Sequence, residues 1–270
     1  MADSRVAVHG AGHLTAALVE GFSRAHTAPV SIYNRTPQRA RGLARVFPIL
    51  RVFEDQAAFD SEKCPLLLVI PGRALLEALH AGTERLKASG RVVVSCANGL
   101  PLPVLEQRFP GIPWIKAIPN VAAAVGKSVT LMAKSAATGE ADFRAVQQIL
   151  GSVGTVFRVQ DDEEMDRLAV VTSCLPGLLG GILDEFAQTY ELDETQTREL
   201  LIESALGSLG LAKRNPAGLQ GLVASVCNPG GLTETGVVTI RKTLPPLLAE
   251  LRNALDRKQE RRRQQYLALH

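Results

Sequence analysis

The sequence predicts an α/β fold, with a doubly wound sheet of buried parallel strands in the first part of the chain and an all-helical second domain. Three observations predict it. Short, continuous apolar runs alternate with stretches of helical spacing in the first half of the chain. The strand-type runs stop after about Asp161, where helical patterns take over. A glycine-rich turn follows the first apolar run. We therefore expect a dinucleotide-binding domain over 1–160 and a helical domain over 161–270.

The expected strands are short runs rich in valine, leucine and isoleucine. They lie at 6–8, 30–33, 66–70, 92–95, 114–116, 129–132 and 153–159. Continuous rather than alternating hydrophobicity indicates strands that are buried on both faces. In the second half, Asp193 and Gln196 have the spacing of a capping box, which predicts the start of a helix. A last helix is expected from near Thr233 toward Tyr266.

Composition limits the function classes. The chain has 270 residues, a net charge of +3, 46% hydrophobic and 21% charged residues, which is typical of a soluble globular protein. The charge is too small to suggest a nucleic-acid partner, and the longest uncharged run, 168–183, is shorter than a membrane span. The four cysteines are scattered, without the spacing of a metal site and without a histidine cluster. Free, scattered thiols favour a reducing compartment, and we therefore expect a cytoplasmic location.

The first expected strand ends in the segment Gly10-Ala11-Gly12-His13-Leu14-Thr15, and a helical pattern follows it. Glycines at these positions allow a tight turn and let backbone amides approach a pyrophosphate. Gly10, Gly12, His13 and Leu14 are therefore candidate cofactor-binding residues in a Rossmann-type domain. Thr15 stands where a third glycine is usual. The alternative is a strand–helix turn that binds nothing.

The second expected strand ends at Asn34-Arg35-Thr36. A site specific for NAD normally has an acidic residue here, which holds the ribose hydroxyls. An amide, a guanidinium and a hydroxyl suit a 2′-phosphate instead. The sequence therefore favours NADPH over NADH. The alternative for Arg35 is a solvated loop charge.

Three further loops follow expected strands, at Pro71, Asn98 and Asn120. Ligands of open α/β sheets bind beyond the carboxyl ends of the strands, so these residues are candidate cofactor contacts. Ordinary turns at strand ends have the same composition, and that alternative stays open for each of them.

The segment "NPGGLT" from Asn228 stands out in the helical half. Pro229 fixes one backbone angle, while Gly230 and Gly231 reach conformations that other residues avoid. Their amides can converge on a small anion at the start of a helix, which Thr233 or Thr235 is expected to cap. The alternative is an ordinary turn between two helices.

With these motifs together, the chain resembles the pyrroline-5-carboxylate reductase family over nearly its full length. The glycine loop matches, and "IPN" at Ile118 is similar to that family's "MPN". "VVTSCLPGLL" from Val170 lies where "SGSGPAY" is typical. "NPGGLT" resembles "SPGGTT" and is the most specific of these matches.

The resemblance implies a role for several residues. Asn228, Gly230 and Gly231 would contact the substrate carboxylate, and the hydroxyl of Thr233 would lie near the ring nitrogen of a cyclic imine. Asn120 would lie beside the nicotinamide. The helical domain would form a homodimer, with a small-molecule imine or keto acid bound between the domains.

The departures from the family pattern fall where the substrate would lie. Leu178 and Leu232 replace polar positions, and Cys174 and Cys227 come near the pocket, with buried packing as the alternative for both thiols. A loss of polar groups changes substrate choice, because a site built to hydrogen-bond its substrate discriminates strongly. From these changes the pocket is expected to accept a different cyclic imine or keto acid, or to have lost catalysis.

Two other functions stay open. The first is a dehydrogenase of 2-keto or 3-hydroxy acids, which usually carries a lysine in the first long helix of the second domain. Between Asp161 and Gln188 this chain has no lysine, and Arg167 is its single basic residue, which counts against that function. The second is a dimeric NADP-binding module without turnover, for which the altered pocket is the motivation.

Overall fold

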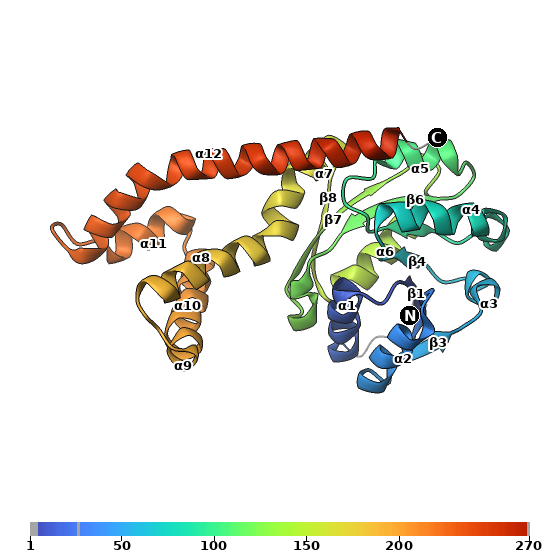
Figure 1. The fold of residues 1–270 in the computed structure, drawn as a ribbon, viewed down its shortest axis with the longest axis horizontal. Coiled ribbons are helices and arrows are strands. Elements are labelled where there is room, and N and C mark those ends of the chain that lie inside the picture. Colours follow the sequence, from blue (N-terminus) through green and yellow to red (C-terminus); the bar gives the residue numbers. More distant parts are fainter. Residues whose placement is uncertain (1–4, 26–27, 269–270) are drawn as a thin grey trace. The chain divides into compact units, whose positions relative to one another are not determined.

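The computed structural model describes residues 5–25 and 28–268 (Figure 1). The chain divides into two compact units, Met1–Pro176 together with Lys258–His270, and Gly177–Arg257. The first unit contains the sheet, and the second is helical. The division into a dinucleotide-binding domain over 1–160 and a helical domain over 161–270 stays a prediction.

The described strands of the first unit form one eight-stranded sheet in the order β3-β2-β1-β4-β5-β6-β7-β8. They are β1 (Val6–His9), β2 (Val30–Tyr33), β3 (Leu50–Phe53), β4 (Leu66–Leu68), β5 (Val93–Ser95), β6 (Trp114–Ile118), β7 (Ser128–Lys134) and β8 (Gly154–Arg158). Neighbouring strands are parallel except β6 and β7, which pair antiparallel. The strand order reverses beside β1, and this places a crevice beyond its carboxyl end. The predicted fold class is confirmed.

Helices cover both faces of the sheet. Successive strand residues point to opposite faces, so Leu66 and Leu68 belong to one core and Leu67 to the other. The helices of this unit are α1 (His13–Arg24), α2 (Pro37–Val46), α3 (Gln56–Asp60), α4 (Gly72–Ser89), α5 (Leu102–Arg108), α6 (Glu140–Gly151) and α7 (Asp162–Ala169), with a short 3₁₀ helix η1 (Val121–Val125). The first core includes α3, α4 and α5, and the second includes α1 and α6.

The second half is helical, as predicted. A π-helical turn η2 (Val170–Cys174) joins α7 to α8 (Leu175–Thr189), and α9 (Glu194–Gln196), a second π-helical turn η3 (Thr197–Ile202), α10 (Glu203–Arg214), α11 (Gly218–Val226) and α12 (Leu232–Leu267) follow. The capping box of Asp193 and Gln196 is confirmed at the start of α9. The last helix has nearly the predicted limits.

The helix formed by α7, η2 and α8 runs without a break over Asp162–Thr189. Its uncharged run is short, as the sequence indicated, but the helix as a whole is long and apolar enough to cross a membrane by length and composition alone. Core helices of globular proteins meet the same criterion but are mostly buried, whereas only 6% of this apolar window is buried. Three acidic residues lie in the first turn, Asp162, Glu163 and Glu164, and their negative charges stabilise the helix by interacting with the positive end of its dipole.

Candidate active site

The glycine loop after β1 has the geometry of a phosphate-binding turn. Gly10 has a φ of 124°, and a Cβ at this position would lie 2.3 Å from the carbonyl oxygen of Val69, so no other residue fits. A Cβ built on Gly12 meets no atom within 4 Å. The loop amides and the N-terminus of α1, which begins at His13, therefore stay open to a ligand. Leu14 is half-buried and packs against the core below.

A third glycine in such a loop usually lets the helix pack closely against the sheet. In this chain Thr15 holds that position, and the glycine that permits close packing of α1 is Gly21, further along the helix. Thr15 is buried in α1, and its hydroxyl has no hydrogen-bond partner among the described residues. At Gly21 a Cβ would lie 2.2 Å from the carbonyl oxygen of Ala123 in η1. Gly21 thus permits the close approach of α1 to η1, a role that spacing alone did not predict.

A cavity of about 430 Å³ lies at the carboxyl end of β2 and beside the N-terminal half of α4. Its lining residues are His9, Tyr33, Asn34, Arg35, Thr36, Arg39, Gln56, Ile70, Pro71, Ala74, Glu77, Ala78 and Ala81. The structure therefore brings together Asn34, Arg35, Thr36 and Pro71 of the predicted cofactor residues. The other predicted residues do not line this cavity.

Arg35 and Arg39 give the cavity two guanidinium groups. Neither forms an ion pair with another described residue. Asn34 donates from Nδ2 to the carbonyl of Thr36 at 2.9 Å, which shapes the turn before α2. Two cationic groups that are free of internal partners suit a phosphate monoester. The sequence pattern had indicated Arg35 but not Arg39, which follows one helical turn later.

His9 is a buried basic side chain on the wall of this cavity. Its ring packs edge-on against Tyr33 at a centroid distance of 5.0 Å and against Phe59 at 6.3 Å. Burial, with a smaller contribution from the charge of Arg91, lowers the pKa of His9 to about 4. The imidazole is therefore neutral at pH 7 and acts as an aromatic wall residue.

Asn120 lies at the end of β6 and is buried. Its Oδ1 accepts from the backbone N–H of Ala122 at 3.1 Å, and its Nδ2 donates to the carbonyl of Thr172 at 2.8 Å. The loop residue Asn120 is thereby joined to η2, the segment that resembles "SGSGPAY". On that segment the hydroxyl of Ser173 is buried without a partner among the described residues, and Cys174 is half-buried.

Asn98 follows β5, and its Oδ1 is buried with no hydrogen-bond partner among the described residues. The last turns of α12 cover this region. A Cβ on Gly99 would lie 3.4 Å from Cβ of Arg262, and one on Gly72 would lie 2.5 Å from the hydroxyl of Tyr266. Glycine at 72 makes room for the Tyr266 ring. This contact was outside the reach of sequence patterns, because it joins residues far apart in the chain.

The turn Asn228–Gly231 is closed by hydrogen bonds of its own. The N–H of Gly231 donates to the carbonyl of Asn228 at 2.9 Å, and Gly230 has a φ of 75°. The N–H of Gly230 donates to Oε2 of Glu234 at 2.7 Å. A carboxylate of the chain therefore sits on one of the two amides that were predicted to bind a substrate carboxylate.

The predicted capping of α12 is wrong. The helix begins at Leu232, before both Thr233 and Thr235, so neither residue stands at the cap position. Thr235 instead donates from its hydroxyl to the carbonyl of Gly231 at 3.2 Å, as a residue inside the first turn does. Glu234 bonds the turn in the way a first-turn acidic residue can. The hydroxyl of Thr233 is on the first turn and is exposed.

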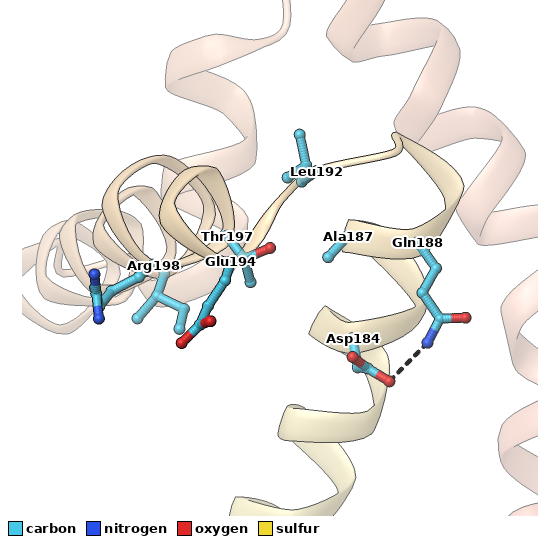
Figure 2. Close-up of a pocket in the computed structure, with 8 residues that line it drawn as sticks. Asp184, Ala187, Gln188, Leu192, Glu194, Thr197 and Arg198 are labelled. Atoms are coloured by element: carbon cyan, nitrogen blue, oxygen red, sulfur yellow. Dashed lines mark hydrogen bonds between the residues drawn. The ribbon is translucent and has the colours of Figure 1, made fainter.

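A second cavity, of about 440 Å³, lies in the helical unit (Figure 2). Figure 2 shows Asp184, Ala187 and Gln188 of α8 on one side and Glu194, Thr197 and Arg198 of the next helical segment on the other. Gln188 donates to Asp184 at 2.9 Å. None of the residues predicted from the sequence lines this cavity.

Other reactive groups are few in the part of the chain that the structure describes. It holds no cluster of three metal-ligating side chains, and its four cysteines are unpaired. Burial raises the pKa of the Cys96 thiol to about 12 and also raises the pKa of Cys64. Both thiols are therefore protonated at neutral pH and act as small apolar groups.

Comparison with known proteins shows which enzymes the chain is related to. No family model matches the chain. It is 26% identical over 240 residues to pyrroline-5-carboxylate reductase of Corynebacterium melassecola, covering 86% of this chain and 88% of that protein. It is 27% identical over 256 residues to the Mycobacterium leprae protein of the same name, covering 85% and 86%.

Solved structures agree on the fold. The crystal structure of Plasmodium falciparum pyrroline carboxylate reductase with NADP bound has a TM-score of 0.81 to this chain, at 16% identity, and covers 96% of this chain and 97% of that one. Both halves of the chain take part in these matches. The predicted resemblance is confirmed: over most of its length this chain is similar to pyrroline-5-carboxylate reductases.

Proposed function

We propose that the chain is an NADPH-dependent reductase that reduces the C=N bond of a cyclic imine carboxylate, namely pyrroline-5-carboxylate to proline or a close analogue. The observation that carries the proposal is the similarity to pyrroline-5-carboxylate reductases across both the sheet and the helical half. A match to the sheet alone would have left every dinucleotide-binding enzyme open.

The cofactor half of the site suits NADPH. Gly10, Gly12, His13 and Leu14 would hold the pyrophosphate at the N-terminus of α1, where the space above Gly12 is open. Asn34, Arg35 and Thr36 would hold the 2′-phosphate, with Arg39 as a second guanidinium. Pro71, Asn98 and Asn120 would face the rest of the dinucleotide from the later strand ends. When bound, the reduced nicotinamide supplies the hydride.

The substrate half is assigned to the turn before α12. Asn228, Gly230 and Gly231 would hold the carboxylate. The hydroxyl of Thr233 would lie near the ring nitrogen of the imine and hydrogen-bond to it. Cys174 would form part of the pocket wall. The substrate would react with its imine nitrogen protonated. A hydride adds to the imine carbon, so one C–H bond forms, the C=N bond becomes single and the nitrogen keeps its proton. A fixed carboxylate and a bonded nitrogen present one face of the ring to the cofactor.

Assembly with a second copy follows from the burial pattern of the helical unit. Among the described residues of Gly177–Arg257, only Ala187 and Ala212 are buried. Large apolar side chains are exposed there, including Ile182 at 58%, Tyr190 at 63% and Leu219 at 65%. Exposed apolar surface on this scale marks an interaction face, and self-association in closed pairs is the commonest solution. A homodimer in the cytoplasm, with no nucleic-acid or membrane partner, is the proposed state.

One observation favours a second candidate, a dimeric NADP-binding module without turnover. Glu234 occupies the Gly230 amide, and Leu232 replaces a polar residue of the related turn. An internal anion at the carboxylate site opposes substrate binding and leaves cofactor binding unaffected. The two candidates differ in turnover and agree in NADPH affinity.

The test uses the full chain with NADPH, pyrroline-5-carboxylate and a panel of related cyclic imines, following NADPH oxidation. Turnover is expected with at least one of them. Thr233→Ala should lower kcat roughly 10- to 1,000-fold while Kd for NADPH stays unchanged, because the lost hydrogen bond lies at the reacting nitrogen. Thr239→Ala, on an exposed later turn of α12, is the matched control and should keep wild-type turnover. Tight NADPH binding without turnover on any imine would favour the binding module.

A further inference from the structure

Pro176 leaves a backbone carbonyl without its usual partner. The residue lies inside the continuous helix Asp162–Thr189. In a regular α-helix the carbonyl of Thr172 would accept from the N–H of residue 176, four residues later. Proline has no N–H, so that bond cannot form. Thr172 lies inside the π-helical turn η2 (Val170–Cys174), where a carbonyl pairs with the N–H five residues later. Pro176 therefore removes the α-helical donor of Thr172 and the π-helical donor of Val171, and π-helical turns are frequent at functional sites.

The side chain of Asn120 supplies the missing donor. Its Nδ2 lies 2.8 Å from the carbonyl oxygen of Thr172. Its Oδ1 is engaged at the same time by the N–H of Ala122, at 3.1 Å. Asn120 is only 7% exposed, so water does not easily replace this bond. One buried amide, two residues after β6, therefore bonds a carbonyl whose α-helical donor Pro176 removes.

This is the second tie between β6 and the same helix. Nearer the start of the helix, the buried Lys116 of β6 forms an ion pair with Asp162, which also accepts from the N–H of Leu102 at 2.8 Å. The first residue of α7 is thus fixed to the sheet, and Asn120 fixes the helix again at Thr172. Between the second tie and Pro176 lie Ser173 and Cys174, on the segment assigned to the substrate pocket.

We infer that Asn120 is a positioning residue that holds the turn Val170–Cys174 in place by bonding the carbonyl of Thr172, whose α-helical donor is absent at Pro176. The inference rests on the proposed function for its catalytic consequence and on this geometry alone for the tie itself. A buried carbonyl that loses its only side-chain donor relaxes toward another partner, and the turn moves with it.

A double-mutant cycle tests the tie. Asn120→Ser keeps a short oxygen that can cap η1 and removes the arm that reaches Thr172. Pro176→Ala restores an N–H that can donate to the same carbonyl. Asn120→Ser alone should lower Tm by roughly 3 to 10 °C. In the Pro176→Ala background the same substitution should lower Tm by less than half as much, because the carbonyl then has a helical donor.

Two further readouts report the position of the turn. The rate at which a thiol reagent modifies Cys174, followed by mass spectrometry, should rise in Asn120→Ser and return toward wild type in the double variant. With an active substrate, kcat should fall roughly 10- to 100-fold in Asn120→Ser and recover most of that loss in the double variant. A direct contact of Asn120 with the nicotinamide would show no such recovery.

Pro246→Ala is the matched control, because it also restores an N–H within a helix, far along the chain on α12. It must not rescue Asn120→Ser. Additive effects of Asn120→Ser and Pro176→Ala on Tm and on Cys174 labelling would overturn the inference, and so would rescue by Pro246→Ala. A wild-type chain that turns over no imine would contradict the proposed function, while the Tm and labelling cycles would still decide the tie.

Discussion

At the residue scale, His9 shows how burial decides the chemistry of a side chain. A histidine at the end of β1, on the wall of the 430 Å³ cavity, looks like a proton-transfer group. Its pKa is lowered to about 4, chiefly by burial, so the ring stays neutral and packs against Tyr33 and Phe59. Its contribution is therefore to packing and to pH-dependent stability.

The sign of that pH dependence follows from linkage. In the unfolded chain His9 takes up a proton near pH 6.5, while in the folded chain it does so near pH 4. Above pH 6.5 the ring is neutral in both states and the free energy of unfolding is unaffected. As the pH falls from 6.5 toward 4, the unfolded chain alone binds the proton, and the free energy of unfolding decreases by about 3 kcal/mol in total. His9→Phe should therefore lose less stability than wild type between pH 7 and pH 4.5 in urea unfolding.

The exposed His80, on α4, is the control for this experiment. His80→Phe should keep the wild-type loss of stability over the same pH range. An unchanged pH dependence in His9→Phe would mean that other groups cause the acid sensitivity.

Glu234 is the second informative residue, because its carboxylate accepts from the Gly230 N–H at 2.7 Å. A substrate carboxylate bound at the proposed site would have to displace it. Glu234→Ala should therefore lower KM for a carboxylate imine by about 10-fold, the value of one charge-assisted hydrogen bond, with little change in kcat. KM for the corresponding imine without a carboxylate should stay as in wild type. A higher KM for the carboxylate in Glu234→Ala would show that Glu234 assists binding.

Sequence patterns predicted the glycine loop and the turn before α12, because glycine and proline act locally there. They did not predict which amides stay free. Gly230 is taken by a side chain four residues later, and Asn120 is taken by a carbonyl in another element. Such bonds depend on how elements meet, which spacing along the chain does not specify.

At the scale of elements, the turn between β2 and α2 determines the expected choice of cofactor. It places Arg35 in the cavity, and α2 adds Arg39. Arg35→Ala should raise Kd for NADPH roughly 10- to 100-fold, because it removes a charge-assisted contact to the 2′-phosphate, and should leave Kd for NADH unchanged. Arg45→Ala, exposed near the end of α2, is the control. Equal losses of NADPH and NADH affinity would contradict this assignment.

Most elements were predictable because their apolar runs are long and buried. β3 was missed. Its four residues, Leu50–Phe53, are half-buried or exposed, and Arg51 interrupts them, as suits the edge of the sheet. The antiparallel pairing of β6 with β7 was not predicted either. It depends on the short η1 connection, which turns the chain back where a longer helical crossover would have kept it parallel.

At the scale of the whole molecule, the two units differ in how they bury apolar surface. The sheet unit has three clusters of buried apolar side chains among the described residues, whereas the helical unit has two small buried residues. The sequence predicted the helices but not this contrast, because helical spacing does not tell whether an apolar face meets the same chain or another.

The exposed apolar surface of the helical unit predicts that the full chain forms a dimer or a larger assembly. Light scattering should therefore give a molar mass of at least twice that of one chain. Ile182→Arg, on the exposed apolar side of α8, should shift the assembly toward smaller species or lower Tm, since it places a charge on the proposed interface. Val46→Arg is the control, because Val46 is an exposed apolar residue at the end of α2 in the sheet unit. A wild-type chain that is monomeric and stable at all concentrations would refute the assembly.

The central claim is that hydride passes to a C=N bond, and isotope transfer measures it most directly. The full chain is incubated with pyrroline-5-carboxylate and NADPH carrying deuterium at C4 of the nicotinamide, in both stereochemical forms. One of the two forms is expected to give proline with a single deuterium on the ring carbon that is bonded to nitrogen and does not carry the carboxylate. Oxidation of NADPH without deuterium in the product would contradict hydride transfer to the imine carbon. So would the absence of a reduced product from pyrroline-5-carboxylate and from every imine of the panel.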